Sequence, residues 1–180
     1  MRLIILSRDG VINEDADDAI RSADRWVPIA GSLEAIARLT QAGYHIVVAT
    51  NQPGIAAGLF DLETLHAMQR KMDKLLAPLG GSVDAVFFCP HGPADACDCR
   101  KPKPGLFLDI ARRYQTRLQG VPAVGRTPAD LEAARAAGAR PVLVRTGKGR
   151  RLPADSIPEQ TPVFESLADF AEALLASRFA

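Results

Sequence analysis

Short apolar runs alternate with amphipathic segments along most of the chain, and this alternation restricts the fold more than any other feature of the sequence. The apolar runs have the length and the β-branched or aromatic content of buried strands, and they cover residues 3–6, 45–50, 85–89, 123–124 and 141–144. Apolar residues at helical spacing predict helices between the N-cap Ser32 and Gly43, and over residues 61–79, 104–114, 128–137 and 166–177. This order predicts an α/β fold of three layers, in which a parallel sheet carries helices on both faces.

The length of the chain fits a single domain over residues 1–180, because domains of this size enclose one hydrophobic core. Residues 145–160 contain a basic stretch with two glycines and, after it, two prolines. We interpret them as a loop that leads to the C-terminal helix, rather than as a linker between two domains. Ligands of open parallel sheets bind at the carboxyl ends of the strands. The polar motifs described below all follow predicted strands, which places them at that edge of the sheet.

The charge of the chain is nearly balanced, with 22 basic and 21 acidic residues and a formal net charge of +1. This balance argues against nucleic acid and against an anionic membrane surface as partners. The first apolar run is too short for a signal peptide, and no stretch reaches the roughly 18 apolar residues of a membrane span. We therefore expect a cytoplasmic protein that is a monomer or a weak oligomer.

The three cysteines lie in one loop together with a histidine, in the sequence CPHGPADACDC. An odd number of cysteines so close together does not indicate a disulfide framework. Cys89 and His91 form one close pair and Cys97 and Cys99 another, and together they supply the ligands of a closed structural zinc site. Because the protein fills all four ligand positions, we expect this zinc to stabilise the loop rather than to activate water. The alternative is a chance group of buried cysteines beside a surface histidine.

Four polar motifs occur at the ends of the predicted strands. They read LSRDGVIN after the first strand, ATNQPGIAAG after the second, CRKPKPG after the third and VGRTPADLEAA after the fourth. Taken alone, each has an ordinary interpretation: an Asp-Gly turn at Asp9, a strand-to-loop cap at Thr50, a solvated basic loop at Arg100 and Lys101, and a helix cap at Asp130. Their joint order and spacing carry more information than any one of them.

In order and spacing, these motifs resemble those of the haloacid dehalogenase (HAD) superfamily, from residue 3 to about residue 147. The zinc loop is similar to that of one branch, which contains the heptose bisphosphate phosphatases and the related histidinol-phosphate phosphatases. The resemblance implies a HAD-like fold with a zinc loop and without a large cap domain. It also implies a hydrolase that removes the 7-phosphate of D-glycero-D-manno-heptose 1,7-bisphosphate, so that the expected partner is a small phosphorylated sugar.

The resemblance also assigns roles to the motif residues. In the family, an Asp at the position of Ser7 attacks phosphorus and becomes an aspartyl phosphate. The residue matching Asp9 transfers a proton to the leaving oxygen. The residue matching Lys101 neutralises the charges of the phosphate and of the nucleophile. The residues matching Thr50 and Asn51 hold the transferring phosphoryl group.

The chain departs from the family pattern at the positions that carry the chemistry. Ser7 replaces the nucleophilic Asp, and Arg126 replaces an Asp that helps to hold the catalytic magnesium in the family. The other magnesium ligands in the family are the nucleophile and the backbone carbonyl at the position of Asp9. Pro53 and Ala57 replace a Ser and an Arg near the expected substrate phosphate. Because magnesium depends on oxygen ligands, and loss of a catalytic group costs on the order of 10⁴–10⁶ in rate, we predict a lost magnesium site and impaired phosphatase activity.

Two further interpretations follow from the same changes. Arg126 can hold a phosphate without a metal, together with Lys101 and with Arg100, whose family counterpart helps to bind the substrate. The chain would then be a metal-free phosphosugar-binding pseudoenzyme. It would alternatively be an engineered inactive phosphatase, because the changes cluster at functional positions while the zinc loop is intact.

Overall fold

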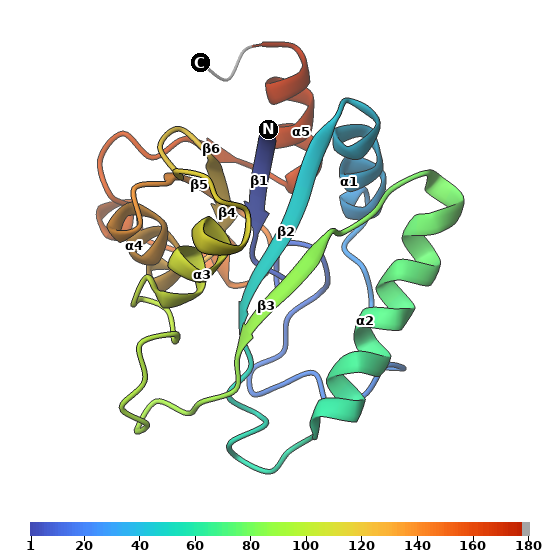
Figure 1. The fold of residues 1–180 in the computed structure, drawn as a ribbon, viewed down its shortest axis with the longest axis vertical. Coiled ribbons are helices and arrows are strands. Elements are labelled where there is room, and N and C mark those ends of the chain that lie inside the picture. Colours follow the sequence, from blue (N-terminus) through green and yellow to red (C-terminus); the bar gives the residue numbers. More distant parts are fainter. Residues whose placement is uncertain (178–180) are drawn as a thin grey trace.

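The computed structural model describes residues 1–177, and its centre is one parallel sheet of six strands (Figure 1). The strands lie in the order β3-β2-β1-β4-β5-β6. Their bounds are Arg2–Leu6 for β1, Tyr44–Asn51 for β2, Ala85–Cys89 for β3, Pro122–Gly125 for β4, Arg140–Val144 for β5 and Val163–Phe164 for β6. Residues 178–180, which the predicted domain includes, lie outside the described part of the chain.

Within residues 1–177, five α-helices cover the sheet: α1 (Ser32–Gln41), α2 (Leu62–Leu76), α3 (Gly105–Arg113), α4 (Pro128–Ala136) and α5 (Leu167–Leu175). Helices α1, α2 and α5 lie on one face, and α3 and α4 lie on the other (Figure 1). The predicted α/β fold of three layers is therefore confirmed. None of the helices in this part of the chain has the length and the apolar character needed to cross a membrane.

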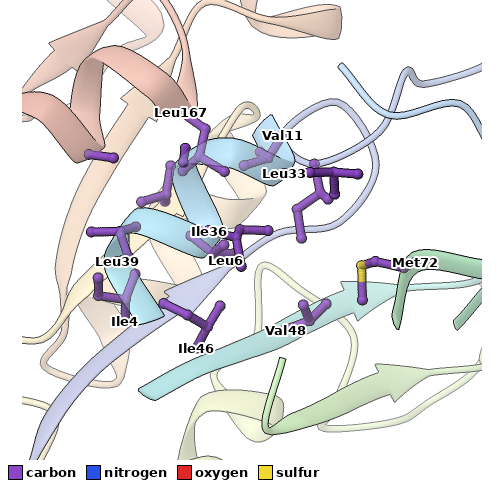
Figure 2. Packing of buried hydrophobic residues seen from close by; sticks show 14 of the residues in the cluster. Ile4, Leu6, Val11, Leu33, Ile36, Leu39, Ile46, Val48, Met72 and Leu167 are labelled. Atoms are coloured by element: carbon purple, nitrogen blue, oxygen red, sulfur yellow. The ribbon is translucent and has the colours of Figure 1, made fainter. Parts of the chain in front are cut away.

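Strand β1 is buried on both faces, and its side chains alternate between two hydrophobic clusters. Ile4 and Leu6 pack with α1 on one side of the sheet (Figure 2), whereas Leu3 and Ile5 pack on the side of α3 and α4. None of these four side chains is more than 4% exposed. Parallel strands that are covered on both faces are apolar without interruption. This is why β1 was visible in the sequence as an unbroken apolar run.

The start of α1 differs from the prediction. The N-cap is Gly31, whose φ of 79° lies in the left-handed region, and Ser32 is the first residue of the helix. The Ser32 hydroxyl donates a hydrogen bond to the carbonyl oxygen of Ile12 at 2.6 Å, so it does not cap the helix. The prediction of Ser32 as the N-cap was wrong because the partner of its hydroxyl lies 20 residues away in the sequence.

Several other elements end at different residues than predicted. Helix α2 stops at Leu76, and the next three residues, Ala77–Leu79, form a 3₁₀ turn that contains Pro78. The predicted loop over residues 145–160 contains two further 3₁₀ turns, Gly147–Arg151 and Ala154–Ser156. Strand β6 was not predicted, and it pairs with β5 at the edge of the sheet.

The polar motifs meet at the carboxyl edge of the sheet. Ser7 follows β1, Asn51 ends β2 and Arg126 follows β4. Parallel pairing of β1 with both β2 and β4 brings these three strand ends side by side. The candidate site is built on this edge, where open parallel sheets usually bind their ligands.

Candidate functional site

The loop after β1 presents Asp9 to a shell of hydrogen-bond donors. The Asp9 carboxylate accepts hydrogen bonds from Arg8 through Nε at 3.0 Å and Nη2 at 3.2 Å. It also accepts one from Asn13 Nδ2 at 3.0 Å and one from Gln52 Nε2 at 2.9 Å. Burial by itself would raise the pKa of Asp9, but the Arg8 charge and these hydrogen bonds hold the pKa below its ordinary value. Asp9 is therefore an ionised carboxylate at neutral pH.

Lys101 lies beneath the strand ends and is held by three oxygens. Its Nζ donates to Asp130 Oδ1 at 2.5 Å, to the Ala49 carbonyl oxygen at 2.8 Å and to Ser7 Oγ at 3.3 Å. Asp130 also closes a capping box with Thr127 at the start of α4. Burial would raise the pKa of Asp130, but the Lys101 charge and the hydrogen bonds of Lys101 and Thr127 keep that pKa well below its ordinary value.

The end of β2 is tied to the basic loop by a pair of hydrogen bonds. Asn51 Nδ2 donates to the Lys101 carbonyl oxygen at 3.0 Å, and the Lys101 backbone N–H donates to Asn51 Oδ1 at 3.0 Å. Thr50 is only 2% exposed, and its hydroxyl oxygen accepts a hydrogen bond from Gln52 Nε2 at 2.9 Å. Asn51 thus positions the loop that carries Arg100 and Lys101.

Arg126 reaches from the end of β4 across to the loop that follows β1. Its Nε donates to the Asp9 carbonyl oxygen at 2.5 Å and lies 3.1 Å from Asp15 Oδ2. Gly10 makes this approach possible, because a Cβ at that position would come within 1.9 Å of Arg126 Nε. The same Asp15 oxygen accepts the Lys148 backbone N–H at 3.0 Å, so one carboxylate joins the loops after β1, β4 and β5.

Three carboxylates at this edge of the sheet each face a cation of the protein. The pairs are Asp9 with Arg8 at 2.9 Å, Asp130 with Lys101 at 2.5 Å and Asp15 with Arg126 at 3.1 Å. No side chain in these pairs is more than 21% exposed. Charges withdrawn from water persist in proteins when they are paired. Each of these carboxylates has its counter-charge within the protein.

A cavity of about 240 Å³ is lined in part by members of these pairs. Its walls include Asp9, Asp15, Asn51, Arg100, Arg126 and Lys148. Ser7, Thr50 and Lys101, which the sequence placed at the centre of the site, do not line it. Sequence reasoning missed Asp15 and Lys148, because Asp15 lies beyond the first motif and Lys148 belongs to a stretch interpreted only as a loop.

The predicted zinc ligands converge in the loop between β3 and α3. The ligand atoms of Cys89, His91, Cys97 and Cys99 all lie within 4.8 Å of one another. His91 Nδ1 is 3.5 Å from Cys89 Sγ and 3.2 Å from Cys99 Sγ. Three sulfurs and one imidazole nitrogen are a ligand set of structural zinc sites, so the residues form a cluster that can hold a metal. Arg100 follows at once, and its Nη1 donates to the His91 carbonyl oxygen at 3.3 Å.

Known phosphatases are similar to this chain over nearly its whole length. The HAD-hydrolase-like family model matches residues 98–170, and the polynucleotide kinase 3 phosphatase model matches residues 7–123. The D-glycero-beta-D-manno-heptose-1,7-bisphosphate 7-phosphatase of Bordetella bronchiseptica is 57% identical over 176 residues, which are 97% of this chain and 98% of that protein. The Pseudomonas aeruginosa protein of the same name is 54% identical over 96% of this chain and 97% of its own length. The chain belongs to this phosphatase family.

Solved structures of heptose bisphosphate phosphatases have the same fold. The B. bronchiseptica D,D-heptose 1,7-bisphosphate phosphatase, complexed with magnesium and phosphate, has a TM-score of 0.96 at 57% identity, covering 98% of this chain and 99% of that chain. The Burkholderia thailandensis protein has a TM-score of 0.77 at 44% identity, with coverage of 98% and 99%. The HAD-like fold and the heptose bisphosphate phosphatase family, both expected from the motifs, are therefore confirmed.

Proposed function

We propose that this member of the heptose bisphosphate phosphatase family binds a phosphorylated sugar at the carboxyl edge of the sheet but has little or no magnesium-dependent phosphatase activity. The expected ligand is D-glycero-D-manno-heptose 1,7-bisphosphate, the compound for which its relatives are named. The protein would thus be a phosphosugar-binding protein on a phosphatase fold.

The hydrogen bond from Arg126 Nε to the Asp9 carbonyl oxygen, at 2.5 Å, carries this proposal. By the family resemblance, that oxygen belongs to the magnesium site, together with carboxylates at the positions of Ser7 and Arg126. Here the oxygen is occupied by a guanidinium group, and two of the three expected ligands are absent from the sequence. A fixed positive charge at this distance repels a second cation, and magnesium requires several oxygen ligands in near-octahedral geometry. The residues present do not fit magnesium.

Within residues 1–177, no base accepts a hydrogen bond from the Ser7 hydroxyl, whose hydrogen-bond partner is the donor Lys101 Nζ. A serine hydroxyl attacks phosphorus only when a nearby base removes its proton. Lys101 Nζ donates a hydrogen bond to Ser7 Oγ at 3.3 Å, and it is paired with Asp130 at 2.5 Å. Lys101 Nζ is thus a hydrogen-bond donor to Ser7 Oγ and not an acceptor of its hydrogen. This arrangement supports weak or absent catalysis by the aspartyl-phosphate route.

We also propose that Cys89, His91, Cys97 and Cys99 bind one structural zinc ion. Their donor atoms lie within 4.8 Å of one another, and a complete set of four protein ligands leaves no position open for water. The zinc would fix the loop that carries Arg100 and Lys101. A cytoplasmic location belongs to this proposal, because thiols remain reduced in that compartment.

Two measurements on the same protein test the proposed function. Phosphate release from the heptose bisphosphate is followed with and without added magnesium, and the melting temperature is recorded with and without the sugar phosphate. We expect no magnesium-dependent release and a melting temperature that the ligand raises by mass action. Release that requires magnesium would contradict the loss of the metal site. A melting temperature that the sugar phosphate leaves unchanged would contradict binding.

A further inference from the structure

Of the two cations that the family resemblance places near the phosphate, Arg100 lines the cavity and Lys101 does not. Lys101 is 5% exposed, and three oxygens take its hydrogen bonds. Arg8 is 2% exposed and is paired with Asp9. An anion that enters the 240 Å³ cavity therefore meets neither of them first. The cationic side chains that line its walls are Arg100, Arg126 and Lys148.

Arg126 keeps much of its hydrogen-bonding capacity available. Its contacts with Asp9 and Asp15 both run through Nε. Within residues 1–177, its two terminal Nη groups form no hydrogen bond. A guanidinium group presents its donors in a planar fork that matches two oxygens of a phosphate. Since Arg126 lines the cavity, that fork is the part of the side chain left to bind a ligand.

Lys148 lies on the opposite loop and is joined to Arg126 through one carboxylate oxygen. Asp15 Oδ2 accepts the Lys148 backbone N–H at 3.0 Å and is 3.1 Å from Arg126 Nε. Gly147 leaves space for these two contacts, because a Cβ at that position would lie 2.6 Å from Asp15 Oδ2. The Lys148 side chain is exposed, and its Nζ has one long hydrogen bond, of 3.5 Å, to the Asp17 carbonyl oxygen. The backbone of Lys148 is thus fixed by Asp15, while its side-chain amino group can bind a ligand.

We propose that Arg126 and Lys148 together bind the phosphate group of a phosphomonoester in this cavity without a metal ion. The inference rests on the proposed function and deepens it by naming the phosphate ligands. Two cations joined by a single carboxylate leave one net positive charge, and a phosphomonoester is close to a dianion at neutral pH because its second pKa is about 6. The guanidinium fork fixes the orientation of the phosphate, and the ammonium adds a point charge from the other loop.

The test is a calorimetric titration in buffer without added divalent cations, with inorganic phosphate and the heptose bisphosphate as separate probes. The variant is Lys148→Met, which removes an exposed charge and leaves the backbone bond to Asp15 intact. Arg150→Met is the matched control, because Arg150 is exposed in the same 3₁₀ turn and does not line the cavity. We expect Lys148→Met to weaken the binding of both probes about tenfold and Arg150→Met to leave it unchanged. Arg126→Gln should weaken binding at least as much, with folding checked by its melting temperature.

The outcomes separate this inference from the proposed function. If the sugar phosphate binds but Lys148→Met and Arg126→Gln bind it as tightly as the unmodified chain, the inference is overturned and the proposed function stands. If inorganic phosphate binds through these two residues and the sugar phosphate does not, the inference stands and the proposed ligand is wrong. If neither probe binds the unmodified chain, both are overturned.

Discussion

Arg126 Nε lies 2.5 Å from the carbonyl oxygen of Asp9, an atom that the family resemblance assigns to the catalytic magnesium site. The same nitrogen is 3.1 Å from Asp15 Oδ2, so the guanidinium has a carboxylate partner within the protein. The positive charge near the strand ends is thus that of the Arg126 side chain, whereas in the family, by the resemblance, it is that of a magnesium ion. Under the proposed function, this exchange leaves phosphate-binding cations at the site and removes oxygen ligands for a metal.

The buried pair of Lys101 and Asp130 is expected to be a major determinant of stability. Asp130→Asn removes the negative charge and leaves Lys101, which is only 5% exposed, without its ionic partner. Breaking a buried ion pair in this way costs about 3–5 kcal/mol of unfolding free energy. Urea denaturation at neutral pH measures this loss. Asp98→Asn is the control, because the Asp98 side chain is fully exposed beside Lys103 and its loss should not measurably change stability.

The contribution of Asp130 is also expected to depend on pH. Its pKa in the folded chain lies below the ordinary value of 3.8, so folding favours the ionised form. The stability gained from ionisation is therefore complete well above pH 3.8 and is lost as the pH falls through the folded-state pKa. The difference in unfolding free energy between the unmodified chain and Asp130→Asn should narrow between neutral pH and about pH 3. A difference that is constant over this range would show that the ion pair is not its source.

Removal of zinc is expected to destabilise the loop between β3 and α3. The four ligand side chains converge there, and the free energy of metal binding contributes to folding wherever the ligands are otherwise unconstrained. His91→Ala should lower both the zinc content and the melting temperature, whereas His66→Ala should change neither, because His66 is exposed on α2. Metal content by mass spectrometry and thermal denaturation measure the two effects. Equal zinc content in both variants would contradict the assignment.

Much of the fold could be predicted because its central strands, β1, β2 and β4, are largely buried. The run from Leu3 to Leu6 is apolar throughout, and such runs between helical patterns indicate a covered parallel sheet. Strand β6 gave no such signal, because it has two residues and follows a stretch rich in turns. Ser32 was misjudged because its hydroxyl bonds to the Ile12 carbonyl oxygen, a tertiary contact without a local pattern.

The sequence predicted which residues lie at the candidate site, but not which of them form ion pairs with one another. The motifs identified Ser7, Asp9 and Arg126 as neighbours at the strand ends. They did not indicate that Asp130 would form a buried ion pair with Lys101. Nor did they indicate that Asp15 would contact both Arg126 and the Lys148 backbone. These contacts connect loops that are distant in the sequence, and they depend on which side chains the packing leaves exposed.

A comparison of four proteins tests the central claim, that a guanidinium group occupies the magnesium site, most directly. Phosphate release from the heptose bisphosphate is measured with and without magnesium for the unmodified chain, Ser7→Asp, Arg126→Asp and the double variant. We predict magnesium-dependent release only from the double variant, which regains both carboxylates, with a gain on the order of 10⁴ or more. Magnesium-dependent release from the unmodified chain, or from Ser7→Asp with Arg126 still in place, would contradict the claim.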